Sequence, residues 1–323
     1  MSVAVTGGSG VVGRAVVGHL VARGDEVWAL ARSPKGSATL SRLGARVVTG
    51  DLFDDDSLAR LVKGRARIFH IAGVNELCSR DPGRMWRANA EGSTRVVQAA
   101  IRAGVGRFIH TSSAVTIGEA EGTVGTEKSL HRGFFLSEYE RSKTVAERLV
   151  LDRADDIEIV SVNPSSVQGP GRSTGTGAIF LAIARGELPL LVDATFSLVD
   201  IDDCARGHLL AADRGESGQR YIISGPVLSM RDAVGVLNRM LGRHRAPSFL
   251  RPGVVMTMAP IVGAMSRVVG KQQMLCTESA RVLLHGHRYD GSKSIRELGL
   301  RYTDLEDTMD RTLKWFESEG LLS

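Results

Sequence analysis

The sequence predicts an α/β protein with a doubly wound parallel sheet and a smaller, interleaved C-terminal domain. Over the first 165 residues, short β-rich runs alternate with segments whose apolar residues recur at helical spacing, as in successive βαβ units. Beyond that point the alternation becomes irregular, and turn signals crowd residues 164–177. A chain of 323 residues is long enough for both parts.

Six strands and four connecting helices are expected in the regular part. The strands are Ser2–Thr6, Glu26–Ala31, Ala45–Thr49, Ala66–Ala72, Arg107–Ser112 and Ile157–Asn163. The helices are Val11–Arg23, Ser57–Lys63, Met85–Ala103 and Tyr139–Arg153. Two more helical patterns, Met230–Leu241 and Leu305–Glu319, follow in the irregular part.

Composition and cysteine usage bound the class of protein. Hydrophobic residues at 43% and charged residues at 24% are typical of a globular chain, and the net charge of +5 comes without a basic run, so no nucleic-acid partner is expected. The cysteines Cys78, Cys204 and Cys276 lie far apart, without a CxxC pair or metal-ligand spacing. This favours a reducing compartment. The first expected strand also starts directly after Met1. Together, the cysteine usage and this early strand predict a cytoplasmic protein.

One uncharged segment, residues 252–266, is flanked by the basic residues Arg251, Arg267 and Lys271. With Pro252 and Pro260 it is too short and interrupted to span a membrane, which takes about 20 residues. A buried or lid helix is the favoured interpretation. A surface that makes weak contact with lipid is the alternative.

A glycine-rich turn follows the first strand. Gly7, Gly10 and Gly13 stand where a strand turns tightly into a helix beginning at Val11 and Val12, whose first amides would face a pyrophosphate. This context predicts a dinucleotide-binding Rossmann sheet. Residues 1–165 would hold the dinucleotide, with 198–224 returning to them, and residues 166–197 and 225–323 would form the substrate domain.

The residue after the second strand indicates which dinucleotide is bound. An NAD-binding enzyme usually has an acid there for the ribose 2′-hydroxyl, whereas this chain has Arg32, whose planar guanidinium suits a 2′-phosphate. NADP is therefore favoured, and NAD is the alternative. Asp51 and Leu52, after the third strand, are expected near the adenine.

A phenol and an ammonium lie four residues apart on one predicted helix, as Tyr139 and Lys143. A nearby cation favours the phenolate and would lower the pKa of Tyr139 from about 10, so that it can exchange protons at neutral pH. This spacing alone is more often a solvated helix face. Here, however, Thr111-Ser112-Ser113 ends the fifth strand at the carboxyl edge of the sheet, where open α/β sheets bind ligands.

With these pieces in place, the sequence resembles the extended short-chain dehydrogenase/reductase superfamily, also called the NAD-dependent epimerase/dehydratase family. Within it, the chain is most similar to the dihydroflavonol 4-reductase-like branch, close to 3β-hydroxysteroid dehydrogenases. The resemblance rests on Thr6-Gly7-x-x-Gly10-x-x-Gly13, Arg32, Asp51-Leu52, His70-Ile-Ala72-Gly73, Asn89, Thr111-Ser112-Ser113, Tyr139-x-x-x-Lys143, Asn163-Pro164 with Gly169-Pro170-Gly171, and Val199-Asp200-x-x-Asp203-x-Ala205-x-Gly207-His208.

The resemblance implies a role for individual residues. Ser113 would orient the carbonyl, Tyr139 would be the acid/base, Lys143 would hold the ribose and tune the tyrosine, and Asn89 would stabilise the active site. Ala72 and Gly73 would pass along the cofactor, and Pro164 to Val167 would border the nicotinamide. The superfamily also implies a homodimer through the helices Met85–Ala103 and Tyr139–Arg153.

The sequence thus predicts an NADP(H)-dependent oxidoreductase for the carbonyl or alcohol group of a small, apolar substrate. An NAD-dependent sugar epimerase or dehydratase is the alternative, which Arg32 disfavours. A non-catalytic NADP-binding redox sensor is disfavoured by the Tyr139 and Lys143 pair. We expect no metal site, and structural roles for His70, His110 and His208.

Overall fold

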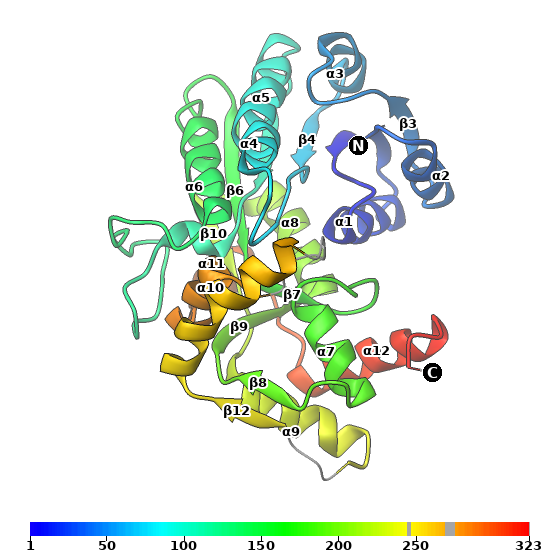
Figure 1. Cartoon of the computed structure of the whole chain (residues 1–323). Coiled ribbons are helices and arrows are strands. Elements are labelled where there is room, and N and C mark those ends of the chain that lie inside the picture. Colours follow the sequence, from blue (N-terminus) through cyan, green and yellow to red (C-terminus); the bar gives the residue numbers. More distant parts are fainter. Residues whose placement is uncertain (244–246, 269–274, 323) are drawn as a thin grey trace.

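A seven-stranded parallel sheet forms one half of the molecule, in the order β10-β6-β5-β4-β1-β2-β3 (Figure 1). The computed structural model describes residues 1–243, 247–268 and 275–322. The strands are β1 (Ser2–Thr6), β2 (Glu26–Ala31), β3 (Arg46–Thr49), β4 (Arg67–His70), β5 (Arg107–Thr111), β6 (Glu158–Pro164) and β10 (Arg220–Ile223). The six expected strands are therefore confirmed, with ends shifted by a few residues, and the sheet is the predicted doubly wound type.

Helices cover both faces of this sheet because successive side chains along a strand point to opposite faces. On β1, Val3 and Val5 pack in one core and Ala4 in the other. The first core is covered by α1 (Val11–Ala22), α2 (Pro34–Arg42) and α8 (Ile201–Arg214), and the second by α3 (Asp55–Val62), α5 (Gly92–Arg102) and α6 (Glu138–Leu151).

Local capping sets where several of these helices begin. The Ser137 hydroxyl accepts the backbone N–H of Glu140 at 3.1 Å and starts α6 directly before Tyr139. Ser33 starts α2 in the same way, with Pro34 as the first helical residue. In the other half, Ser229 and Asp232 form a capping box. Short polar side chains thereby fix the register of each helix.

The expected long helix Met85–Ala103 is interrupted. It consists of α4 (Pro82–Trp86), a π-helical turn over Arg87–Glu91 and α5. The π turn inserts an additional residue into the helical repeat, and such turns are frequent at functional sites. Apolar periodicity does not register one inserted residue, which is why the sequence indicated a continuous helix.

The second half of the molecule contains two small sheets and five helices in its described residues. One sheet has the order β11-β9-β7, and the other pairs β12 with β8. The strands are β7 (Ser166–Gln168), β8 (Leu190–Val192), β9 (Thr195–Asp200), β11 (Val227–Ser229) and β12 (Ser248–Leu250). The helices are α7 (Thr176–Arg185), α9 (Met230–Met240), α10 (Pro252–Val268), α11 (Thr277–His285) and α12 (Leu305–Ser318). Two short helices, a 3-10 turn over Ala114–Ile117 and a π turn over Ser294–Leu298, lie in connecting segments.

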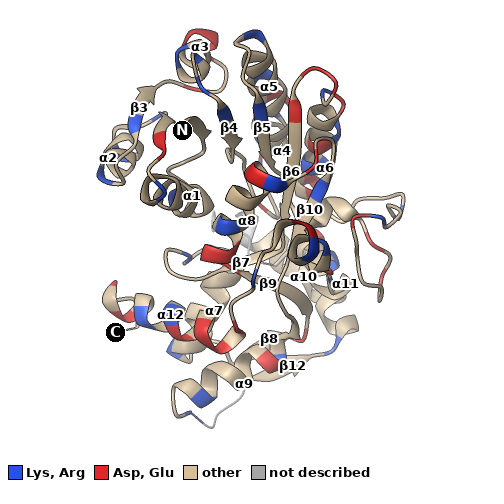
Figure 2. Ribbon diagram, turned by 180° about the vertical axis from the view of Figure 1, so that it is seen from behind, with Lys and Arg blue, Asp and Glu red and all other residues tan. Residues whose placement is uncertain are grey.

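α10 lies between the two halves in both ribbon views (Figures 1 and 2). It packs on α11 through a small apolar cluster of Val255, Ala259 and Ala280. Within the described residues, no helix is long and apolar enough to cross a membrane. The expected basic flank Lys271 lies outside the described residues.

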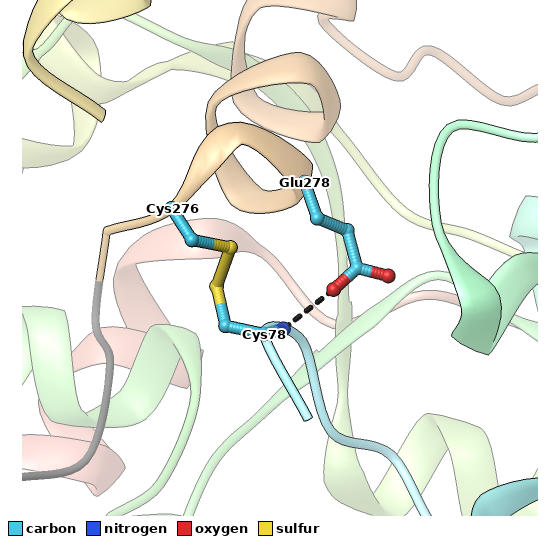
Figure 3. A group of neighbouring side chains, drawn as sticks. All are labelled: Cys78, Cys276 and Glu278. Carbon is cyan, nitrogen blue, oxygen red and sulfur yellow. Dashed lines mark hydrogen bonds between the residues drawn. A yellow bond between two sulfur atoms is a disulfide. The ribbon is translucent and has the colours of Figure 1, made fainter. Parts of the chain in front are cut away.

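A disulfide joins Cys78 to Cys276, which are separated by 198 positions in the sequence (Figure 3). This corrects the premise that the three cysteines are unpaired, from which a reducing compartment was expected. The fold brings the β4–α4 loop against the start of α11, a proximity that sequence spacing does not reveal. Cys204 is the free, buried thiol.

Candidate functional site

The glycine turn packs directly against the end of β4. Gly7 has a φ of +71°, and a Cβ atom on it would lie 2.4 Å from the backbone N of Ala72. A Cβ atom on Gly13 would lie 2.1 Å from the Gly7 carbonyl oxygen. Gly10 precedes α1 without a side-chain cap, so the first amides at Val11 and Val12 face the turn. These residues fit the pyrophosphate of a dinucleotide.

Arg32, Asp51 and Leu52 lie at one edge, because β2 and β3 are neighbours. Arg32 is 75% exposed, and its Nε lies 3.8 Å from Asp51 Oδ2. Asp51 also accepts the backbone N–H of Phe53 at 3.0 Å. The Arg32 guanidinium is exposed and makes only this long contact with Asp51 among the ion pairs of the described residues, so it is available to an anionic ligand.

Asn89 lies in the π turn and holds two elements of the site. Its Oδ1 accepts the Val74 N–H at 2.7 Å, and its Nδ2 donates to the Val74 carbonyl and to Ser142 Oγ, each at 2.9 Å. A Cβ atom on Gly73 would lie 3.1 Å from Asn89 Oδ1 and 3.8 Å from Lys143 Nζ. The structure therefore brings Ala72 and Gly73 together with Asn89 and Lys143. Ser142 was not singled out from the sequence.

Lys143 is buried and points back to the end of β5. Its Nζ donates a hydrogen bond to the Thr111 carbonyl oxygen at 2.7 Å. Burial lowers the pKa of Lys143 to about 8, against the opposing attraction of Glu147. The pKa of the Lys143 ammonium is thus close enough to neutral pH for it to release a proton.

Tyr139 and Ser113 meet at the carboxyl end of the sheet. Burial raises the pKa of Tyr139 above its ordinary value, although the neighbouring Ser113 side chain and Arg172 both oppose the increase. The sequence predicted that Lys143 would lower the pKa of Tyr139, whereas in the structure this pKa is raised. The reason is that burial outweighs the favourable neighbours, and the ammonium is engaged by Thr111.

The remaining expected residues frame this pair. The Ser113 carbonyl accepts hydrogen bonds from Thr116 and from Asn163 Nδ2 at 3.2 Å, which fixes the backbone that carries the serine. Pro164 ends β6, and Val167 lies buried in β7, on the strand that leads into the second half.

The three histidines expected to be structural are all buried. His70 bridges Thr6 and Ser93, at 2.7 and 2.8 Å, and burial lowers its pKa to about 3. His208 Nδ1 donates to the Cys204 carbonyl at 2.7 Å, so its Nε2 accepts from Thr111 Oγ1 at 2.9 Å. Burial lowers its pKa to about 4. His110 stacks on His70, with ring centroids 5.7 Å apart.

Arg172, in the loop between β7 and α7, was missed by sequence reasoning. Its guanidinium influences Tyr139 electrostatically and lies beside Gly175, where a Cβ atom would be 3.1 Å from Nη2. Its buried Nε has no hydrogen-bond partner, and no salt bridge to it is found among the described residues. A single arginine in a glycine-rich stretch gives no periodic signal, so only the fold reveals it.

Comparison with known proteins now decides the family. Residues 3–224 match the model of the NAD dependent epimerase/dehydratase family, which covers more than half of the chain. The chain belongs to this family. It is an NAD(P)-dependent oxidoreductase of the extended short-chain dehydrogenase/reductase type, as the resemblance implied.

Three curated relatives are 29–31% identical to the chain over the aligned residues. A putative dihydroflavonol 4-reductase of Synechocystis sp. is 30% identical over 98% of this chain and 94% of its own length. The sterol demethylase protein B of Methylococcus capsulatus is 29% identical over the whole of both chains. A 3 beta-hydroxysteroid dehydrogenase/Delta 5-->4-isomerase of Mycobacterium tuberculosis is 31% identical over 69% of this chain and 64% of its own length.

Solved structures share the fold. The crystal structure of gox2253 superposes with a TM-score of 0.86 at 29% identity, covering 100% of this chain and 99% of that one. The dTDP-glucose 4,6-dehydratase DesIV of Streptomyces venezuelae, solved with NAD bound, gives a TM-score of 0.79 at 24% identity over 98% and 97% of the two chains. The second likeness concerns the fold alone.

Proposed function

We propose that this protein is an NADP(H)-dependent oxidoreductase that interconverts a carbonyl and an alcohol on a small, apolar substrate. The observation that carries the proposal is the convergence of Ser113, Tyr139 and Lys143 at the sheet edge where Gly7 packs against Ala72. Hydroxyl groups, an ammonium and a glycine cradle in one place suit proton transfer beside a bound dinucleotide.

The chain's own residues would position the substrate and move one proton. In the reducing direction, the hydroxyls of Ser113 and Tyr139 would hydrogen-bond the substrate carbonyl oxygen. Tyr139 would donate its proton to that oxygen, Lys143 would reprotonate the resulting phenolate, and solvent would return a proton to the Lys143 amine. The nicotinamide, when bound, supplies the hydride that completes the alcohol. Asn89 would keep Ser142 and Val74 in place around this centre.

The preference for NADP is supported by the exposed guanidinium of Arg32. A planar guanidinium can bind a 2′-phosphate through two parallel hydrogen bonds, whereas the 2′-hydroxyl of NAD is usually held by a carboxylate. No carboxylate occupies the position after β2, where Ala31, Arg32 and Ser33 follow one another. NAD is the alternative cofactor.

The proposed division of labour assigns the dinucleotide to residues 1–165 with 198–224, and the substrate to residues 166–197 and 225–323. Within the second part, α10 supports an apolar substrate because large hydrophobic side chains remain exposed along it. These are Val254, Met256, Met258, Ile261 and Met265. In the other part of the chain, Phe134 and Phe135, in the loop before α6, are also exposed.

Two further expectations stay proposals. A homodimer would form through α5 and α6, and sedimentation at several concentrations tests it. The other is the cytoplasmic location. The cysteines no longer support it, because Cys78 and Cys276 form a disulfide.

The deciding experiment is an NADPH-oxidation screen over aldehydes, ketosteroids and flavonoid-type ketones, with NADH in parallel. Tyr139→Phe should lower the activity by about 10²- to 10⁴-fold, the usual contribution of a positioned acid/base. Tyr221→Phe is the matched control, since its hydroxyl accepts the backbone N–H of Glu216 and takes no part in the proposed site. Full activity in Tyr139→Phe would refute the mechanism. Stoichiometric, retained NAD with no net reduction would instead favour a sugar epimerase.

A further inference from the structure

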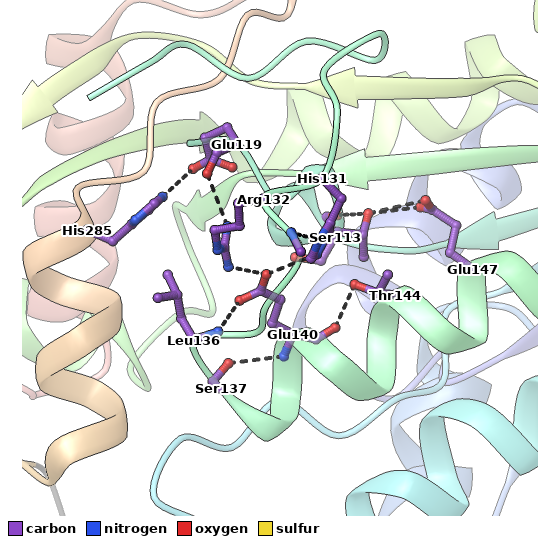
Figure 4. A network of polar contacts seen from close by, with 12 residues as sticks. Ser113, Glu119, His131, Arg132, Leu136, Ser137, Glu140, Thr144, Glu147 and His285 are labelled. Carbon is purple, nitrogen blue, oxygen red and sulfur yellow. Dashed lines mark hydrogen bonds and ion pairs between the residues drawn. The ribbon is translucent and has the colours of Figure 1, made fainter. Parts of the chain in front are cut away.

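Glu119, His285, His287 and Tyr289 converge in a buried cluster outside the site described above. Glu119 Oε1 lies 2.7 Å from His287 Nδ1 and 3.5 Å from His285 Nε2. The hydroxyl of Tyr289 lies 2.9 Å from the same His287 Nδ1. Figure 4 shows His285 pointing from α11 towards Glu119, which lies in the segment after β5. Glu119, His285 and His287, from two distant parts of the chain, thus place three potential ligand atoms within 4.8 Å of one another, and the Tyr289 hydroxyl lies beside them.

Hydrogen bonds within the cluster leave ligand atoms unused. Glu119 is 1% exposed, and its Oε2 has no hydrogen-bond partner in the described part of the chain. The same holds for the Nε2 of His285, whose side chain is 6% exposed. Buried polar atoms are nearly always paired, and leaving a carboxylate oxygen unpaired has a high free-energy cost. The nearest carboxylate oxygen to His285 Nε2 is Glu119 Oε1, and the 3.5 Å between these two atoms is too long for a good hydrogen bond.

The neighbouring charges leave that carboxylate without a full counter-charge. The nearby guanidinium of Arg132 donates to the backbone carbonyl of Glu119 at 3.2 Å and to the carboxylate of Glu140. His131 lies 3.6 Å from the same Glu140 oxygen. Arg132 is therefore matched by Glu140. Among the described residues, the polar side chains around the Glu119 carboxylate are the imidazoles of His285 and His287 and the phenol of Tyr289.

We infer that Glu119, His285 and His287 bind a divalent transition-metal ion of the zinc class, with the Tyr289 hydroxyl next to the fourth position. Zinc binds imidazole nitrogen and carboxylate oxygen at about 2.0–2.2 Å in a tetrahedron, so its ligand atoms lie about 3.3 Å apart. The separations of 2.7 and 3.5 Å around Glu119 bracket that value. Two nitrogen ligands disfavour magnesium and calcium, which prefer oxygen.

Binding requires that His287 Nδ1 and His285 Nε2 offer lone pairs. A proton on His287 Nδ1 would leave to solvent or be exchanged for one on Nε2, as is usual when a metal displaces protons from its ligands. Nothing else is transferred or oxidised. The expectation of no metal site missed this cluster because Glu119 and His287 lie 168 positions apart.

Such a metal would join α11 to the segment that follows Ser113. The other end of α11 is already joined to the β4–α4 loop by the disulfide. The buried position of Glu119 is that of a closed, structural site, so the metal would contribute to stability. The inference stands independently of the proposed reaction.

The test uses the full-length oxidised protein, purified without a polyhistidine tag and stripped with a chelator. Co²⁺ is added first and followed by visible absorption, then Zn²⁺ is titrated by calorimetry. The disulfide is kept intact and checked by thiol counting, because reduced Cys78 and Cys276 with Glu278 would offer a second set of ligands. We expect one ion per chain, a tetrahedral Co²⁺ spectrum, and a higher unfolding temperature with Zn²⁺.

Two kinds of variant locate the ion. Glu119→Gln and His287→Asn should each weaken Zn²⁺ binding by about 100-fold or more, since even outer-shell changes weaken metal binding by about 10- to 100-fold. His19→Asn and Glu278→Gln are the controls, and both should bind as the unmodified chain does. His19 pairs with Asp202 on another surface, at 3.2 Å.

The outcomes are decisive either way. No uptake of Co²⁺ or Zn²⁺ at micromolar concentration by the unmodified chain would overturn the inference, as would equal binding by Glu119→Gln. If the variants do not fold, X-ray absorption of the zinc-loaded unmodified protein replaces them. Two imidazole ligands would support the site, and a sulfur ligand or water alone would refute it.

Discussion

Glu278 accepts the backbone N–H of Glu138, the first residue of α6, through its Oε1 at 2.7 Å. Its other oxygen accepts the backbone N–H of Cys78 at 2.5 Å. One carboxylate at the start of α11 thus ties down both the β4–α4 loop and the beginning of the helix that carries Tyr139 and Lys143. Negative charge at the start of α6 is also favoured by the helix dipole.

The disulfide beside this carboxylate should contribute strongly to stability. In the chain-entropy model, closing so long a loop contributes about 5 kcal/mol to the free energy of unfolding. Reduction, or the double change Cys78→Ser with Cys276→Ser, should therefore lower the urea midpoint substantially. Cys204→Ala should respond to reductant as the unmodified chain does. Three titratable thiols in the oxidised, unfolded protein would contradict the pairing.

Arg32→Ala should change the cofactor preference. Losing charge-assisted hydrogen bonds to a 2′-phosphate costs about 1.5–3 kcal/mol, so kcat/KM with NADPH should fall by about 10- to 100-fold. The value with NADH should stay nearly constant. Arg46→Ala, which removes another exposed arginine that pairs with Glu26, should leave both values unchanged. Equal losses with the two cofactors would rule out a role in recognising the 2′-phosphate.

We expect Arg172 to contribute to substrate or dinucleotide binding and not to the stability of the fold. Burial lowers the pKa of Arg172, and no counter-ion is found among the described residues. Arg172→Met should therefore raise the free energy of unfolding of the chain alone by about 1 kcal/mol, because an unpaired charge is removed. The same change should weaken substrate or dinucleotide binding. A destabilised but fully active variant would be the opposite result.

Binding of NADPH should weaken as the pH rises through about 8. Burial lowers the pKa of Lys143 to about 8, so the ammonium is charged below this pH and neutral above it. The charged form has three N–H donors, so two remain for a ribose beside the hydrogen bond to the Thr111 carbonyl. Fluorescence titration of NADPH from pH 6.5 to 9.5 measures the change. Lys143→Arg should retain binding at the alkaline end, and a constant Kd throughout the range would exclude the ionisation.

Acid should destabilise the protein through its buried histidines. The pKa of His208 is lowered to about 4 and that of His70 to about 3, whereas the unfolded chain takes up these protons near pH 6.5. The unfolded state therefore binds more protons, and stability falls as the pH decreases from about 6.5 towards 4. His208→Asn should make the urea midpoint less dependent on pH over this range. His19→Asn, on the surface, should not.

Features with a local cause could be predicted from the sequence. The alternation of β-rich runs with helical patterns gave the six strands, because the side-chain period of each element is a property of consecutive residues. The Gly7, Gly10 and Gly13 turn gave the start of α1 for the same reason. The spacing of Tyr139 and Lys143 gave their shared helix.

Features with a non-local cause could not be predicted in this way. The raised pKa of Tyr139 depends on burial by distant segments, and the partner of Cys78 depends on where α11 lies. The π turn at Asn89 is compensated by contacts with Val74 and Ser142 that the apolar pattern does not encode. Arg172 can be recognised only from the folded structure, where its buried Nε has no hydrogen-bond partner among the described residues.

Anchoring α11 at both ends restricts how the molecule can open. Its first turn is bonded to the β4–α4 loop, and its last residue and His287 lie against Glu119. Because α11 is held at both ends, it cannot rotate about one end as a rigid lid. The preceding helix, α10, carries exposed methionines, and such flexible side chains can rearrange around an apolar molecule without breaking a backbone hydrogen bond.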